Sequence, residues 1–123
     1  MSARWKGLLA VALVVAPAVA LAQQAPTSVD KGREAYEYWC ATCHGRGNRF
    51  PGTIALQAKY GGKVPGVLED RTDLTPASIR LFVRRGTSIM PFFRKTEVSD
   101  DALEAIAAYL TRPRPPAAPG GGR

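Results

Sequence analysis

Two thiols and an imidazole lie within five consecutive residues of this chain, Cys40-Ala41-Thr42-Cys43-His44. Two cysteines three positions apart, followed directly by histidine, are typical of the sequence to which a c-type haem is attached. Each thiol adds across one vinyl group of the porphyrin, so the two thioethers fix the ring edge against the backbone. The imidazole of the next residue then faces the iron as its proximal ligand. The motif predicts one covalently bound haem c, held by Cys40, Cys43 and His44.

Other uses of these residues fit less well. A thioredoxin-like redox pair needs alternating strands and helices, and no run of β-branched residues makes a convincing strand here. A structural zinc ion needs four ligands, but the chain has two cysteines and one histidine in all. A disulfide accounts for the cysteines and leaves His44 unexplained. With the single histidine assigned to iron, no Ser-His-Asp or Cys-His nucleophile can be assembled, so we predict no catalytic residue.

Met90 is the candidate for the second axial ligand of the iron. It is the only methionine apart from Met1, and a second histidine is absent from the sequence. A lone methionine commonly fills a gap in a core, but Pro91 prevents a helix from carrying Met90 onto a helical face. A thioether opposite the imidazole raises the reduction potential and closes the iron to oxygen or peroxide. We therefore predict His44 and Met90 as axial ligands, which disfavours a haem enzyme or gas sensor with open iron.

A proline shortly after the motif is the candidate for orienting the imidazole. A ligating histidine usually donates its other ring N–H to a backbone carbonyl. The loop at Pro51 is expected to supply that acceptor, from Phe50, Pro51 or a neighbour. A proline that only forms a turn, without orienting the imidazole, looks identical in the sequence.

The first 22 residues have the pattern of a secretory signal. Basic residues precede an apolar stretch over 8–16, and Ala20-Leu21-Ala22 is a small-residue cleavage site. The apolar stretch is too short to span a membrane. We expect cleavage of residues 1–22 and export to the periplasm, with no membrane span afterwards; retention as an uncleaved anchor is the alternative.

The C-terminal segment and the signal carry most of the net positive charge of the chain. Residues 113–123 are rich in proline and glycine, which predicts a disordered tail. The net charge of +7 falls to +5 without residues 1–22 and to +2 without Arg112, Arg114 and Arg123. Two haem propionates bring the domain close to neutral. Nucleic-acid binding needs a basic face on the folded part, so no nucleic-acid partner is predicted.

One domain, residues 28–112, remains after a short lead over 23–27. Within it, four segments have the start and stop signals of helices, and we predict an all-α fold. The expected helices run from the cap Ser28 to the haem motif, from Thr53 to Tyr60, from the cap Thr75 with Pro76 to Gly86, and from the cap Ser99 to Pro113. No role is assigned to the Gly- and Pro-rich stretch from Tyr60 to Leu68.

The chain resembles class I c-type cytochromes. The resemblance is carried by Gly32-x-x-x-Tyr36-x-x-x-Cys40-x-x-Cys43-His44, by the Met90-Pro91 loop, and by a last helix that ends Ala108-Tyr109-Leu110. It implies the class I cytochrome c fold, with three core helices around one haem c and with the first and last helices crossing beside the haem.

A narrower likeness concerns the small cytochrome subunit of flavocytochromes of the 4-cresol dehydrogenase and eugenol hydroxylase type. It rests on Pro51-Gly52-Thr53, Ala58-Lys59-Tyr60, Arg71-Thr72-Asp73-Leu74-Thr75 and the run from Met90 to Glu97. This likeness implies a non-catalytic subunit that takes single electrons from a flavoprotein acting on para-substituted phenols and passes them to a downstream soluble acceptor. The alternative is a free soluble cytochrome that carries electrons to a terminal oxidase.

The same resemblance suggests where a partner docks. In the cytochrome fold the loop that carries the methionine lies beside the haem edge. Ser88, Ile89, Phe92 and Phe93 are then the nearest candidates to meet a flavoprotein. Core packing against the third predicted helix is the other interpretation of Phe92 and Phe93.

Overall fold

The computed structural model describes residues 25–114, so the predicted signal and residues 115–123 of the predicted tail lie outside the described residues. Within 25–114 the chain forms helices and an isolated bridge between Thr87 and Met90, and no strand. The predicted all-α class is confirmed. The elements are α1 (Ser28–Trp39), α2 (Ala41–His44), α3 (Pro51–Tyr60), the 3₁₀ helix η1 (Leu68–Asp70), α4 (Pro76–Arg85) and α5 (Asp100–Thr111).

Short polar side chains begin three of the helices. Thr75 caps α4 and Ser99 caps α5, as predicted. The cap of α1 is Thr27, one residue before the predicted Ser28. The reason is the acid at Asp30: it lies three residues after Thr27 and accepts from the Thr27 N–H at 3.1 Å, while the Thr27 hydroxyl accepts from the Asp30 N–H at 3.2 Å.

The second predicted helix is longer than expected, and an additional short one follows the first. α3 begins at Pro51 rather than Thr53, because proline is favoured at the first helical position, where its missing N–H costs no hydrogen bond. It ends, as expected, at Tyr60, and the capping residue Gly61 has a φ of 56°, in the left-handed region that favours glycine. The haem motif itself forms the separate short helix α2 after a break at Cys40.

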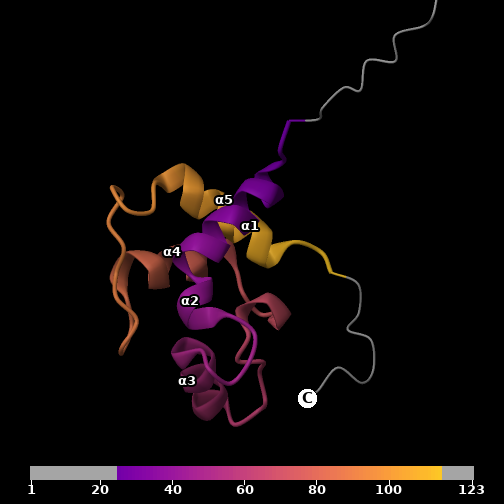
Figure 1. The fold of residues 1–123 in the computed structure, drawn as a ribbon, viewed down its shortest axis with the longest axis vertical. Coiled ribbons are helices and arrows are strands. Elements are labelled where there is room, and N and C mark those ends of the chain that lie inside the picture. The colour runs from indigo at the N-terminus through magenta and orange to yellow at the C-terminus, as the bar shows by residue number, and fades with distance from the viewer. Residues whose placement is uncertain (1–24, 115–123) are drawn as a thin grey trace, which may run out of the picture.

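The close contact of α1 with α5 sets the architecture (Figure 1). The two helices touch at Gly32, where an added Cβ would lie 1.9 Å from the carbonyl oxygen of Ala105 and 2.9 Å from the Cβ of Tyr109. One turn further along α1, the ring of Tyr36 packs against the ring of Tyr109, with centroids 5.5 Å apart. The crossing of first and last helices is the arrangement that the cytochrome resemblance implied.

The core lies between these helices and α4. Tyr36 contributes from α1, and the other fully buried apolar residues come from α4, α5 and the segment before α5: Ile79, Val83, Val98, Leu103, Ile106, Ala107, Tyr109 and Leu110. Trp39, Cys40, Met90 and Phe93 are partly buried against this same cluster. The core therefore reaches the haem motif on one side and the methionine loop on the other.

The Gly32 contact predicts a large effect of one methyl group. Gly32→Ala should lower the free energy of unfolding of the haem-loaded protein by about 1–3 kcal/mol, because a Cβ overlaps the α5 backbone and that overlap outweighs the gain in helix propensity. Urea unfolding followed by helical circular dichroism measures it. The matched control is Lys31→Ala at the exposed neighbouring position, expected within about 0.5 kcal/mol of wild type. Equal stability of the two variants would contradict the close crossing.

Candidate haem site

The three residues of the haem motif are held on one helical turn. Cys40 ends α1, and the carbonyl of Cys40 accepts from the N–H of Cys43 at 3.1 Å and from that of His44 at 2.8 Å. Both cysteines are free thiols, with Cys40 partly buried and Cys43 exposed. The geometry keeps two thiols and an imidazole together without joining the thiols to each other. This is the arrangement that attachment to two vinyl groups requires.

Two buried hydroxyls fix the backbone that follows the motif. The Tyr36 hydroxyl, on α1, donates to the carbonyl of His44 at 2.9 Å. The Thr53 hydroxyl, on α3, donates to the carbonyl of Gly45 at 2.8 Å. Both donor side chains are fully buried. The motif is therefore held from both sides. Tyr36 belongs to the motif that carries the cytochrome resemblance, whereas Thr53 was not predicted as a site residue. The signal at Thr53 is a polar residue inside a short apolar helix.

The environment of His44 suits a neutral metal ligand. Burial of the ring lowers the pKa of His44 below its ordinary value. A lowered pKa favours the uncharged imidazole, which is the form that binds a metal ion. On one side the ring meets Gly52: a Cβ there would lie 2.8 Å from Cε1 of His44 and 2.9 Å from Nδ1. Glycine at this position lets α3 approach the imidazole closely.

The expected hydrogen bond from the imidazole to the Pro51 loop is not present. Nδ1 of His44 is buried and has no partner in residues 25–114. The reason is that Pro51 begins α3, so the nearby carbonyls turn into the helix; that of Phe50 accepts from the N–H of Ile54 at 3.0 Å. Pro51 acts as a helix start in this structure, and Gly52 is the residue of that segment that borders the ring.

The two thiols of the motif differ in their surroundings, since Cys40 is partly buried and Cys43 is exposed. Burial, and to a lesser extent the neighbouring Cys43, raise the pKa of the Cys40 thiol to about 12. The Cys40 side chain is therefore a neutral thiol at neutral pH. Within residues 25–114 no group of three or more His, Cys, Asp and Glu side chains is placed to hold a metal ion. The donor set instead fits haem, which brings four nitrogen ligands of its own.

Met90 lies at the end of a tight turn beside the core. The backbones of Thr87 and Met90 exchange hydrogen bonds of 2.9 and 3.0 Å, with Ser88 at a φ of 50° between them. Gly86 lies against this turn, since a Cβ there would come within 2.7 Å of the Met90 carbonyl oxygen. Met90 is half-buried and packs on the cluster that Cys40 and Trp39 also contact. The fold thus brings the predicted thioether ligand to the same core as the haem motif.

These features define a cytochrome c domain. The sequence profile of the family described as "Cytochrome C oxidase, cbb3-type, subunit III" matches residues 27–110, from the cap of α1 almost to the end of α5. The chain belongs to this family and is an electron-transfer domain, which implies covalent haem c at the cysteine pair. No curated protein and no solved structure matches the chain. None of the helices in residues 25–114 is long and apolar enough to cross a membrane.

The contact between Gly52 and the imidazole predicts a change at the haem. Gly52→Ala should cost about 1–3 kcal/mol of stability and alter the visible circular dichroism of the haem, because the ring of His44 must move. Gly61→Ala is the control: it has no neighbour within 4 Å and a left-handed φ, so it should cost about 1 kcal/mol and leave the haem dichroism unchanged. Identical haem dichroism in both variants would show that Gly52 does not position the ring.

Proposed function

We propose that this protein is a periplasmic c-type cytochrome that accepts single electrons from a flavoprotein dehydrogenase subunit acting on para-substituted phenols. It passes the electrons to a downstream soluble acceptor. The observation that carries the proposal is the pairing of the Cys40–His44 motif with the Met90 turn on one core. Cys40 and Cys43 form the thioethers, and His44 and Met90 are the axial ligands. Residues 1–22 direct export and are then removed.

The chain's own residues favour transfer of electrons over chemistry at the iron. Haem, when bound, supplies a one-electron couple. Tyr36 and Thr53 hold the backbone of the motif from two helices, which fixes the position of the residue that would bind the iron. Met90, at the end of its hydrogen-bonded turn, would be the second iron ligand and would leave no coordination position for a substrate.

Side-chain exposure supports a docking surface on the methionine loop. Ile89 is 75% exposed and Phe92 is 61% exposed. Phe93 differs, since its ring lies edge-on to Trp39 with centroids 6.2 Å apart and its side chain packs on the core. Of the predicted contact residues, Ile89 and Phe92 are therefore the apolar anchors that we propose meet the flavoprotein. A near-neutral domain suits docking through apolar contact rather than through long-range charge.

A second candidate function has an observation of its own. The matched family takes its description from a subunit of an oxidase. This favours the alternative of a cytochrome that carries electrons to a terminal oxidase. The two candidates share the haem site and differ in their partners, a flavoprotein donor in the first and a terminal oxidase as acceptor in the second. Co-purification of a yellow flavoprotein with the chain from its native source supports the first. Oxidation of the reduced chain by a terminal oxidase, with no flavoprotein co-purifying, supports the second.

Met90→Ala tests the axial ligation. The ferric wild type should show the weak near-infrared charge-transfer band of a sulfur-to-iron bond. The variant should lose this band, have a lower reduction potential, and bind cyanide or carbon monoxide quickly, because one axial position is free. Visible and near-infrared spectroscopy with potentiometry measures all three. An unchanged spectrum in the variant would remove Met90 from the site.

Phe92→Ser and Phe93→Ser form a matched pair that tests the docking surface. Phe92→Ser should weaken flavoprotein binding by about 2 kcal/mol, or roughly thirtyfold in Kd, with an unchanged haem spectrum and Tm. Phe93→Ser should instead lower stability by about 2–4 kcal/mol and leave the binding of the folded fraction intact. Titration calorimetry and thermal unfolding separate the effects. Normal binding by Phe92→Ser would exclude that residue from the interface.

A further inference from the structure

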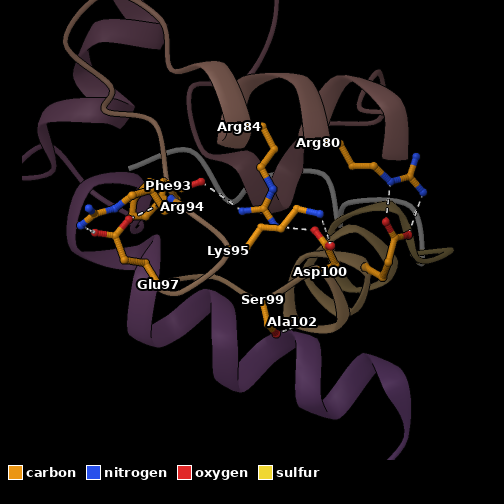
Figure 2. Close-up of polar contacts among 10 residues, drawn as sticks. Arg80, Arg84, Phe93, Arg94, Lys95, Glu97, Ser99, Asp100 and Ala102 are labelled. Atoms are coloured by element: carbon orange, nitrogen blue, oxygen red, sulfur yellow. Dashed lines mark hydrogen bonds and ion pairs between the residues drawn. The ribbon is translucent and has the colours of Figure 1, made fainter.

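The side chain of Arg84 joins three parts of the fold (Figure 2). It lies near the end of α4, and its Nη1 donates to the carbonyl of Phe93 at 3.1 Å while its Nη2 donates to Oδ1 of Asp100 at 2.9 Å. Asp100 is the first residue of α5, and its other oxygen accepts from Nζ of Lys95 at 2.7 Å. We call Arg84, Asp100 and Lys95, with the Phe93 carbonyl, the Arg84 clamp.

The clamp closes the segment that carries Met90. This segment leaves α4 at Gly86 and returns at Phe93, whose N–H donates to the carbonyl of Val83 at 2.8 Å. The N–H of Phe93 is therefore bonded to the backbone of α4 and its carbonyl to a side chain of α4. Met90 lies between these two fixed ends. The bonds at Phe93 thus hold the end of this segment against α4.

Arg84 is placed to hold the Met90 segment against α4, and its neighbour Arg80 is not. Arg80 pairs with Glu104 through two of its three donor nitrogens, Nε and Nη2, and makes no hydrogen bond to the Met90 segment within residues 25–114. Its side chain is 45% exposed, compared with 22% for Arg84. Water therefore screens the Arg80 guanidinium more strongly, while the two partner carboxylates are similarly exposed. A planar guanidinium also serves two acceptors in a fixed geometry, which a lysine ammonium on a flexible stem does not.

The clamp joins two cations to one carboxylate. Asp100 faces the two cations Arg84 and Lys95, and hydrogen bonds from Lys95 first and Arg84 second lower the pKa of Asp100. The carboxylate stays ionised at neutral pH and also lies at the positive end of the α5 dipole. The clamp thus ties the Met90 segment to the start of α5 as well as to α4.

We propose that Arg84 is a positioning residue for the thioether of Met90: through Phe93 and Asp100 it keeps the Met90 segment closed and so limits how easily the sulfur leaves the iron. This inference rests on the proposed axial role of Met90. In this proposal the Arg84 clamp affects the position of Met90 separately from the overall stability of the helices.

The test compares Arg84→Ala with Arg80→Ala in the ferric, haem-loaded protein. Loss of the charge-assisted hydrogen bond from Arg84 to the Phe93 carbonyl, the bond that holds the Met90 segment, corresponds to about a tenfold change in the equilibrium of opening. Arg84→Ala should therefore bind cyanide about tenfold faster than wild type, and its sulfur-to-iron band should disappear on heating at a lower temperature than its helical circular dichroism. Arg80→Ala should bind cyanide at the wild-type rate, with band and helices lost together.

A second pair keeps the test decisive if Arg84→Ala does not fold. Asp100→Asn removes the carboxylate that faces Arg84 and Lys95. Asp101→Asn removes the next carboxylate in the same helical turn, which makes no ion pair within residues 25–114. Faster cyanide binding in Asp100→Asn alone supports the clamp.

Two results would overturn the proposal, and they differ from each other. In the first, Arg84→Ala and Arg80→Ala bind cyanide at equal rates, or the two aspartate variants do so if Arg84→Ala is unfolded. This result would show that the clamp has no effect on Met90, and it would leave Met90 as a ligand. A wild-type protein without the sulfur-to-iron band would remove the ligand itself, and with it the basis of the clamp.

Discussion

The hydroxyl of Tyr36 connects the helix crossing to the haem motif, and the rest of the site depends on that connection. The ring of Tyr36 packs on Tyr109 where α1 and α5 meet, and its hydroxyl donates to the carbonyl of His44. Burial raises the pKa of Tyr36, with a smaller contribution from Glu69, so the group remains a donor. The close approach at Gly32 makes this packing possible. A change in the crossing is thus transmitted to the backbone of the iron ligand.

α5 supports both sides of the proposed haem site. Near its end, Tyr109 packs on Tyr36 and so borders the side that carries His44. At its start, Asp100 holds Arg84 and Lys95, which border the segment that carries Met90. The two proposed axial ligands come from distant parts of the sequence and share no direct bond in residues 25–114. Their relative position is set through one helix and its packing on α1 and α4.

The parts of the structure that depend on local sequence were predictable. The caps at Thr75 and Ser99 and the glycine stops at Gly61 and Gly86 follow from backbone preferences of single residues, and the all-α class follows from them. The cap of α1 was predicted one residue too late, at Ser28. Thr27 caps the helix instead, because its hydrogen bonds with Asp30 are reciprocal.

The contacts around the proposed ligands were less predictable because they join residues far apart in the sequence. Nothing near Thr53 indicates a hydrogen bond to Gly45, and nothing near Arg84 indicates Phe93 or Asp100 as partners. The predicted hydrogen bond from His44 to the Pro51 segment is not formed, since the loop that it assumed is the first turn of α3. The haem motif itself needed no tertiary information, because its chemistry is contained in five consecutive residues.

The central claim is that Cys40 and Cys43 hold one haem covalently. The most direct measurement is the intact mass, under denaturing conditions, of the protein exported in a host that attaches haem c. The account predicts a mass greater than that of the processed polypeptide by one haem, and a haem that acidified organic solvent does not extract. A mass equal to that of the bare polypeptide, with haem lost to the solvent, would contradict it.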